Sequence, residues 1–387
     1  MRVLHIITRM IIGGAQENTL YNCLDLMRDY QDDVLLVTGP EQGPEGGLLD
    51  QGRAGGLPIH TADSLRRNIH LGHDWRARAE LRSIIDEFKP DVVHTHSAKA
   101  GMIGRMVAWK ARVPAVIHTV HGAPFHPYQS WAARRFFITC ERAAARRCHH
   151  MISVADAMTD LMTSAGVAKR EKFTTIYSGM DVEPFVRAEE HRAEARRELG
   201  FHDDDVVFGK IARLFHLKGH EYLIEAAEEV VRENPRCKFL LVGDGILRPQ
   251  LEADLKARGL ERSFVFAGLV PPERIPYCLG AMDALVHTSL REGLARTLPQ
   301  ALIAGRPVIS YDVDGAREVV LPDLTGFLLP PKSIKPLTDS ILKLAASTEL
   351  RHRLGTFGAA KFVDQFRHQT MTRKIREVYQ RVLNRSV

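Results

Sequence analysis

Two basic side chains and one glutamate have the types and the spacing that suit a diphosphate group. Arg213 and Lys218 lie five residues apart, where a short apolar run gives way to a helical pattern. Arginine can bind a phosphate through two parallel hydrogen bonds, and lysine acts as a point charge. Farther along, the polar loop 289–295 carries Glu292 and leads into a second helical stretch, whose first backbone N–H groups can bind an anion. These patterns predict a site for the phosphates and sugar of an activated sugar donor.

Glycines follow several of the predicted strands, where a ligand could approach the backbone closely. They are Gly13 and Gly14 in the first half of the chain and Gly243, Gly245, Gly268 and Gly293 in the second. Each glycine alone could be an ordinary turn residue. The ordered set favours a binding site, because ligands of open parallel sheets bind at the carboxyl ends of the strands.

Histidines end two predicted strands of the first half. His94 and His96 close the run VVHTHS, and His118 and His121 close the run AVIHTVHG. We expect these side chains to point into a cleft, with His121 the strongest candidate, and His5 to be a core residue. The spacing also allows zinc, but no carboxylate or cysteine pattern supports it, so we expect no metal.

The elements that must position these residues alternate along the chain. Apolar runs of strand length lie at 3–7, 34–38, 91–94, 115–120, 151–154, 173–176, 206–211, 238–242, 264–266, 284–287, 308–310 and 326–329. Helical patterns lie between most of them, at about 14–28, 75–88, 98–111, 129–150, 219–233 and 247–258, and follow Ser333. Residues 41–56 are expected to be a mobile loop with little helix, and residues 181–199 a connector. Alternation of this kind indicates parallel sheets covered on both faces, an α/β fold.

The length of 387 residues is typical of about two domains. We expect an N-terminal Rossmann-like domain at 1–185 and a C-terminal one at 190–366, both doubly wound and facing a central cleft.

Composition narrows the partners and the compartment. The chain has 53 basic and 47 acidic residues, a net charge of +6, which permits an anionic partner without requiring one. Because this excess is mild, we expect no nucleic acid partner. Five scattered cysteines without a CxxC pair suggest a reducing compartment. No apolar run is long enough to span a bilayer, and the apolar start is interpreted as a buried strand rather than a signal peptide. A cytoplasmic location follows.

The stretch 129–150 is expected to be a helix in which five arginines are interleaved with Trp131, Phe136 and Phe137. Two interpretations stay open. The helix packs its aromatic side chains on the sheet, or it also lies on an anionic membrane surface at the inner face of the membrane.

Taken together, the motifs resemble those of a GT-B glycosyltransferase of the large retaining family 4 (glycosyl transferases group 1). The matching stretches lie between about residues 3 and 330: Gly13-Gly14-Ala15-Gln16, His121-Gly122, Ser178-Gly179-Met180-Asp181, Arg213 with Lys218-Gly219, Val242-Gly243-Asp244-Gly245, Ser289-Leu290-Arg291-Glu292-Gly293, Ala304-Gly305-Arg306-Pro307-Val308 and Gly315 through Glu318. The resemblance implies that the second domain binds the nucleotide sugar and the first the acceptor. It also implies that a last helix, about 370–387, returns to the first domain.

The resemblance implies a role for each matching residue. Arg213 and Lys218 are expected to neutralise the leaving diphosphate, Glu292 to bind sugar hydroxyls, and His121 to contact the sugar near the reaction centre. Donor-binding residues are expected at Gly13, Gly14, Gly243, Gly245, Gly268, Gly293, Leu294, Ala295, Gln300 and Glu318, and acceptor-binding residues at Gln16, His94, His96 and His118. No cofactor and no metal ion is expected.

The expected reaction moves a hexosyl or N-acetylhexosaminyl group, with retention of configuration. The donor would be a nucleotide-diphosphate sugar, with UDP favoured and GDP the alternative. The acceptor would be a glycan, a lipid-linked acceptor or a small molecule in cell-envelope polysaccharide or glycolipid synthesis. Two other classes stay open, a catalytically silent GT-B partner subunit and a GT-B-shaped nucleotide-sugar epimerase.

One residue departs from the family pattern. The family usually has a second glutamate eight residues after the first, where this chain has Gln300. An amide can still bond ribose hydroxyls, but without the help of a charge.

Overall fold

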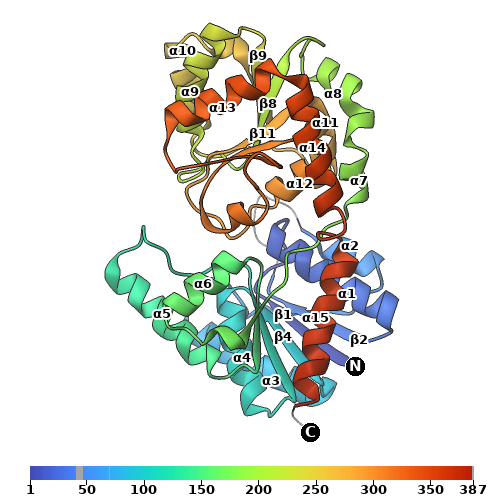
Figure 1. Ribbon diagram of the computed structural model, residues 1–387. Helices are drawn as coiled ribbons and strands as arrows, with labels where there is room; N and C mark the ends of the chain where they lie inside the picture. The colour runs from blue at the N-terminus through green and yellow to red at the C-terminus, as the bar shows by residue number, and fades with distance from the viewer. Residues whose placement is uncertain (41–46, 69, 386–387) are drawn as a thin grey trace. The chain divides into compact units, whose positions relative to one another are not determined.

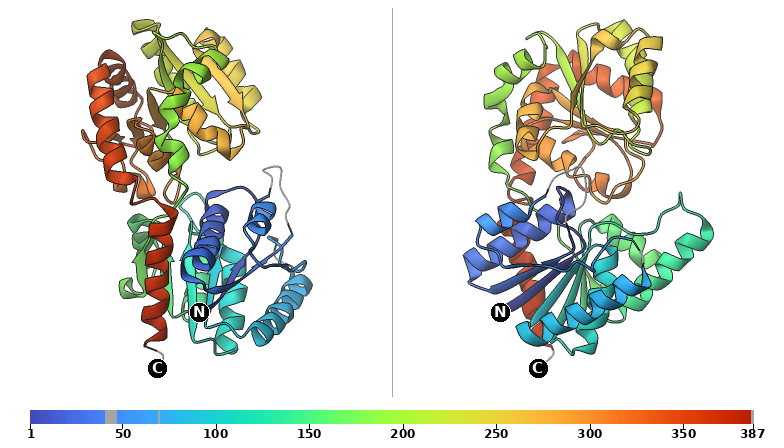
Figure 2. Two further views of the ribbon diagram at one scale, coloured as in Figure 1. Left: turned by 90° about the vertical axis from the view of Figure 1, so that its right-hand side faces the viewer. Right: turned by 180° about the vertical axis from the view of Figure 1, so that it is seen from behind.

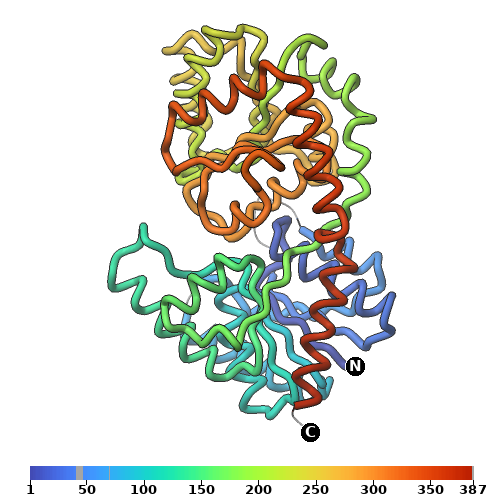
Figure 3. Tube along the Cα trace, viewed as in Figure 1, coloured from blue at the N-terminus to red at the C-terminus, as the bar shows by residue number. Residues whose placement is uncertain are grey.

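The computed structural model describes residues 1–40, 47–68 and 70–385 of the chain. These residues divide into two compact units. The first unit comprises Met1–Met180 and Gln365–Val387, and the second unit comprises Asp181–Asp364. Figure 3 traces the chain out of the first unit, through the second and back into the first.

The first unit is built on a seven-stranded parallel sheet. Its strands are β1 (Arg2–Ile7), β2 (Asp33–Thr38), β3 (Ile59–Thr61), β4 (Val92–His96), β5 (Ala115–Val120), β6 (His150–Ser153) and β7 (Phe173–Thr175). They lie in the order β3-β2-β1-β4-β5-β6-β7. The helices are α1 (Gly14–Tyr30), α2 (Leu49–Ala54), α3 (Leu71–Phe88), α4 (Ala98–Lys110), α5 (Trp131–Ala145), α6 (Asp156–Ser164) and α15 (His368–Leu383).

Helices cover both faces of this sheet, as Figures 1 and 2 show. Strand side chains alternate between the faces, so Val3 and Ile7 of β1 pack with α1 and α15, whereas Leu4 and Ile6 pack with α3 and α4. Burial on both faces explains why the strands appear in the sequence as continuous apolar runs.

The second unit is built on a six-stranded parallel sheet. Its strands are β8 (Val206–Ile211), β9 (Cys237–Val242), β10 (Phe264–Gly268), β11 (Ala284–His287), β12 (Val308–Tyr311) and β13 (Gly326–Leu329), in the order β10-β9-β8-β11-β12-β13. The helices are α7 (Glu183–Val186), α8 (Arg192–Glu198), α9 (His220–Glu233), α10 (Arg248–Ala257), α11 (Ile275–Ala281), α12 (Thr297–Ile303), α13 (Ile334–Ala346) and α14 (Thr348–Phe362).

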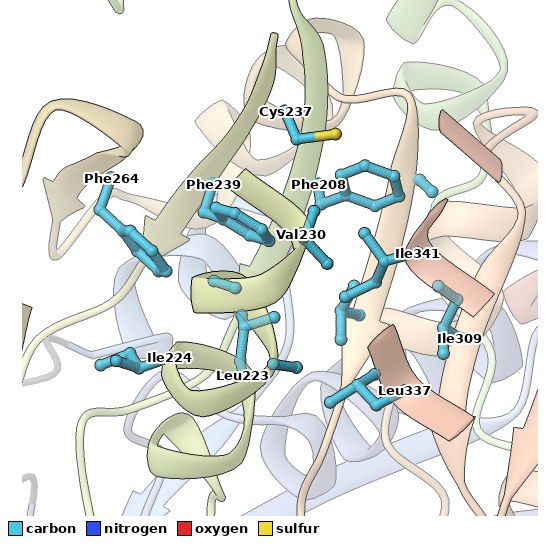
Figure 4. Close-up of a cluster of buried hydrophobic side chains, with 14 of the residues drawn as sticks. Phe208, Leu223, Ile224, Val230, Cys237, Phe239, Phe264, Ile309, Leu337 and Ile341 are labelled. Atoms are coloured by element: carbon cyan, nitrogen blue, oxygen red, sulfur yellow. The ribbon is translucent and has the colours of Figure 1, made fainter. Parts of the chain in front are cut away.

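One apolar core joins this sheet to α9 and α13. Figure 4 shows Phe208, Phe239 and Phe264 from three adjacent strands beside Leu223 and Val230 of α9. The rings of Phe239 and Phe264 stack with their centroids 4.6 Å apart.

The structure corrects several expected elements. Helix α3 begins at Leu71 rather than near residue 75, because the His70 ring accepts a hydrogen bond from the His73 N–H and caps the helix. Helix α5 ends at Ala145, because the chain must turn before His150 enters β6. The expected loop 41–56 contains helix α2, while its residues 41–46 lie outside the described part of the chain. Strand β3 and helices α6 and α11 were not predicted.

The expected connector 181–199 is helical and belongs to the second unit. Two arginines of α8 anchor it by pairing with Asp283: Arg192 donates to one carboxylate oxygen at 2.7 Å and Arg196 to the other at 2.6 Å. The backbone N–H of Val207 adds a third bond at 2.7 Å. The Asp283 side chain is only 9% exposed, so its charge depends on these partners.

Within the part of the chain that the structure describes, no helix combines the length and the apolar character needed to cross a bilayer.

Candidate functional site

An ion pair at the carboxyl edge of the six-stranded sheet joins two of the expected catalytic residues. Lys218 precedes α9, and Glu292 lies in the loop after β11. The lysine Nζ lies 2.5 Å from Glu292 Oε1, and the two side chains are 22% and 21% exposed. Burial would raise the pKa of Glu292, but the charge of Lys218 and the hydrogen bond from it hold that pKa below its ordinary value. Glu292 is therefore a carboxylate with a cation beside it.

The backbone of the Glu292 loop is held in place by a short 3-10 helix, Asp314–Glu318. The Glu292 N–H donates to Asp314 Oδ2 at 2.6 Å, and the Gly315 N–H donates to the Gly293 carbonyl at 2.9 Å. Asp314 itself has a left-handed backbone with φ near 48°. The sequence interpretation missed Asp314, although the Asp-Gly pair just after a predicted strand was a signal for a turn at this edge.

A buried lysine connects the Lys218 loop to the strand end before the Glu292 loop. Lys210, near the end of β8, is 1% exposed and donates from Nζ to Thr288 Oγ1 at 2.9 Å. The Thr288 hydroxyl donates in turn to the Gly219 carbonyl at 2.6 Å. Gly219 has φ near +68°, and a Cβ there would lie 2.0 Å from the Thr288 carbonyl oxygen. Only glycine fits, so the two segments are packed backbone to backbone.

The electrostatics of this edge are set by burial. Burial, and to a lesser extent the nearby charge of Lys218, lowers the pKa of Lys210 to about 7, although Glu292 and Glu221 oppose the shift. Burial also lowers the pKa of His220 to about 2 and that of His287 to about 3, so both rings are neutral near pH 7. Lys210 was missed from the sequence because it lies inside an apolar strand.

Arg213 lies at the same edge, just beyond the end of β8. Its side chain is exposed, and its guanidinium group lies over the Phe215 ring, 5.2 Å from the centroid. Two of the glycines expected to bind the donor pack closely against this segment. A Cβ at Gly243 would lie 2.2 Å from the Ala212 carbonyl oxygen, and one at Gly245 would lie 2.4 Å from that of Leu214.

The remaining residues expected to bind the donor lie on nearby elements of the second unit. Leu294 and Ala295 are half-buried in the loop before α12, Gln300 is half-buried on α12, and Gly268 ends β10. Glu318 is half-buried on the 3-10 helix that carries Asp314.

The first unit places the other candidates at the carboxyl edge of its own sheet. Gly13 caps the N-terminus of α1, and the side chain of Gln16 folds back over it: a Cβ at Gly13 would lie 2.8 Å from Gln16 Oε1. Gly14 is the first residue of α1. His121, just beyond β5, is half-buried, and its Nε2 lies 3.0 Å from His96 Nδ1.

Three of the expected acceptor residues face the protein interior, which corrects the prediction that they point into a cleft. His94 and His96 are 0% exposed and His118 is 3% exposed. The strand pleat directs His94 and His96 under α15, where His94 lies 2.5 Å from the Tyr379 hydroxyl and 2.7 Å from that of Thr119. His118 lies on the opposite face, with Nδ1 2.9 Å from the Thr95 hydroxyl.

Among the described residues, His5, His94 and His96 form a group whose ligand atoms could surround a metal ion, since these atoms lie within 4.8 Å of one another. Both ring nitrogens of His94 and of His96 already have hydrogen-bonding partners in the protein. The geometry therefore matches a hydrogen-bonded cluster better than a metal centre.

The sequence matches two family models, one for each half. The model described as Glycosyltransferase Family 4 matches residues 12–184, and that described as Glycosyl transferases group 1 matches residues 191–361.

Similar proteins include an Escherichia coli UDP-Gal:alpha-D-GlcNAc-diphosphoundecaprenol alpha-1,3-galactosyltransferase, 28% identical over 89% of this chain and 88% of the relative. Another is the alpha-D-kanosaminyltransferase of Streptomyces kanamyceticus, 30% identical over 59% of this chain and 57% of the relative. Among solved structures, Anabaena HepE in complex with UDP superposes with a TM-score of 0.83 at 23% identity, over 98% of this chain and all of that chain. HepE has also been solved with UDP-glucose, with a TM-score of 0.82 at 22% identity and the same coverage.

The buried ammonium of Lys210 predicts a pH-dependent penalty on stability. We expect Lys210→Met to raise the melting temperature, and by more at about pH 6 than at about pH 9. In the unfolded chain the amine stays protonated up to its ordinary pKa near 10.5, whereas in the folded protein it loses the proton near 7. The unfolded state thus binds more protons between these values, so the penalty is full below pH 7 and fades as pH rises.

Calorimetry at the two pH values checks this, with Lys256→Met on the exposed face of α10 as the control. An equal gain at both pH values, or a larger gain at the higher one, would contradict the prediction.

Proposed function

Because the chain belongs to the family 4 glycosyltransferases (glycosyl transferases group 1) and has the GT-B fold, we propose that it transfers a sugar from a nucleotide-diphosphate sugar to a lipid-linked glycan acceptor. The observation that carries this proposal is the ion pair of Lys218 and Glu292 at the carboxyl edge of the six-stranded sheet. This pair supplies both groups that such a donor needs, a cation for the diphosphate and a carboxylate for sugar hydroxyls.

The proposed catalysis acts on the charge that develops as the bond from the sugar to the diphosphate breaks. Negative charge accumulates on the departing phosphate, and Lys218 and Arg213 are proposed to stabilise it there. Without a donor, Lys218 and Glu292 neutralise each other. When a diphosphate binds, the lysine would share its charge with the phosphates, and Glu292 would accept hydrogen bonds from the sugar.

We propose UDP as the nucleotide, because Anabaena HepE, whose fold this chain shares, has been solved with UDP and with UDP-glucose, and the E. coli relative is named for UDP-Gal. Gln300 would bond the ribose hydroxyls as a neutral partner. The retention of anomeric configuration and a hexosyl or N-acetylhexosaminyl group as the transferred sugar belong to the same proposal.

For the acceptor we propose a glycan on a diphosphate-linked polyprenol, since the E. coli relative is named for such a substrate. Gln16 is proposed to contact the acceptor. His121 is proposed to contact the sugar near its reacting carbon.

A lipid-linked acceptor requires the protein to reach a membrane, and the surface of α5 suits that contact. Trp131 is 75% exposed, Phe136 is 54% exposed, and Tyr128 just before the helix is 55% exposed. Arg134 and Arg135 are exposed on the same first turns. The aromatic side chains therefore do not all pack on the sheet, contrary to the first interpretation from the sequence. We propose that this surface binds an anionic bilayer at the cytoplasmic face.

We expect the double variant Trp131→Ser/Phe136→Ser to bind vesicles of phosphatidylglycerol and phosphatidylcholine at least about tenfold more weakly than the wild type. Removing one aromatic side chain that is buried in the bilayer costs more binding free energy than the roughly 1.4 kcal/mol that corresponds to a tenfold change in affinity. Cosedimentation measures the binding, and Trp75→Ser on α3, where the indole is 70% exposed, is the matched control. Equal loss in the control variant would contradict the assignment to α5.

The proposed reaction needs no divalent metal, because Lys218 and Arg213 supply the positive charge. Transfer is therefore expected to continue in EDTA, measured as UDP release in the presence of acceptor. Complete loss in EDTA with recovery on added manganese would contradict it.

Glu292→Ala and Lys218→Ala are each expected to reduce transfer by at least about a hundredfold while the protein stays folded. The assay follows radiolabelled sugar from UDP-galactose, UDP-glucose, UDP-N-acetylglucosamine or GDP-mannose onto a polyprenyl-diphosphate N-acetylglucosamine acceptor. Circular dichroism checks the fold, and Glu252→Ala, at an exposed position on α10, is the control.

Wild-type turnover by either site variant would reject the site assignment. Donor binding without any transfer by the wild type would favour a catalytically silent partner subunit.

A further inference from the structure

Three histidines form a continuous hydrogen-bonded row in the first unit. His5 Nδ1 on β1 lies 3.0 Å from His96 Nε2 on β4. His96 Nδ1 lies 3.0 Å from Nε2 of His121, which follows β5. The row runs from the buried centre of the sheet to its carboxyl edge, since His5 and His96 are fully buried and His121 is half-buried.

The buried rings of this row are neutral. Burial lowers the pKa of His5 to about 3, and burial with the neighbouring imidazoles lowers the pKa of His96 well below its ordinary value. A neutral imidazole carries one proton, so each ring donates at one nitrogen and accepts at the other. His94 lies beside the row but outside it, because its nitrogens bond the hydroxyls of Tyr379 and Thr119.

Only two proton arrangements satisfy both nitrogen–nitrogen contacts when the rings are neutral. In the outward arrangement, His5 and His96 each donate from Nδ1, and His121 accepts at Nε2. In the inward arrangement every bond is reversed, and the last proton sits on His5 Nε2. That atom is buried and has no hydrogen-bond partner among the described residues. Buried N–H groups without an acceptor are rarer than buried acceptors without a donor, so the outward arrangement is favoured.

We propose that His96, backed by His5, is a positioning residue that holds His121 in the tautomer with its proton on Nδ1. This inference rests on the proposed function only in that His121 is the residue assigned to the sugar. In this tautomer His121 has a donor at Nδ1, and its Nε2 lone pair accepts the hydrogen bond from His96. It therefore acts as a hydrogen-bond donor to a sugar oxygen and not as a general base.

The tautomer is measured directly by two-bond ¹H–¹⁵N correlation spectra of histidine-labelled protein, in which the His121 signals are identified by their loss in His121→Asn. The wild type is expected to show one His121 species, protonated at Nδ1. His96→Asn places an amide N–H near the position of Nδ1 and should keep that species. His96→Phe removes the donor and should give the Nε2-protonated form or a mixture.

His118→Asn, a change of a buried histidine of β5 on the opposite face of the sheet, is the control and should leave the His121 signals unchanged. A wild-type His121 protonated at Nε2, or an unchanged species in His96→Phe, would overturn the proposal. Stoichiometric zinc in the purified protein would also overturn it, because a metal would occupy the nitrogens of the row.

Transfer assays add a second readout. His96→Phe is expected to lower kcat about tenfold or more with little change in the donor KM, and His96→Asn to restore most of the rate. If His121→Asn transfers sugar normally, the proposed role of His121 fails, while the spectra still decide whether the row sets its tautomer.

Discussion

The buried amine of Lys210 is the constraint around which the carboxyl edge of the second unit is arranged. Its hydrogen bond to Thr288, and that of Thr288 to Gly219, join the segment that carries Lys218 to the start of the loop that carries Glu292. A charge in this position is costly, and the protein accepts the cost where it fixes the distance between two functional side chains. Asp314 also fixes this loop, because its carboxylate accepts a hydrogen bond from the Glu292 N–H.

The two units hold polar side chains together in different ways. In the second unit, charged groups at the sheet edge are brought together by the hydrogen bonds of a buried lysine. In the first unit, neutral imidazoles are brought together by the pleat of adjacent strands, which places His5, His94 and His96 on one face. Neutral rings can be buried without a counter-ion, provided their nitrogens find partners, and Tyr379 of α15 supplies one of these.

Most strands and the long helices could be predicted from the sequence, because continuous apolar runs and helical periodicity are local signals. Lys218 and Glu292 were predicted as site residues because both follow strands, but the ion pair between them was not predicted. The role of Lys210 could not be predicted, because its partner Thr288 comes close to it only when β8 pairs with β11. The burial of His94 and His96 depends on which face of the sheet α15 covers. The sequence gives no local signal for this, because Tyr379 of α15 lies 285 residues after His94.

That separation also has a consequence for biosynthesis. The core on one face of the first unit includes Met371, Ile375 and Tyr379, which leave the ribosome only after the whole second unit has been made. Until α15 has been made, the first unit therefore has an uncovered apolar face. Its buried Asp25 carboxylate can pair with Arg28 but not yet with His368 and Thr372. The second unit is made of one continuous segment and can fold during translation. The order of folding is then expected to be the reverse of the order of synthesis, with the first unit exposed to chaperones and proteases in the interval.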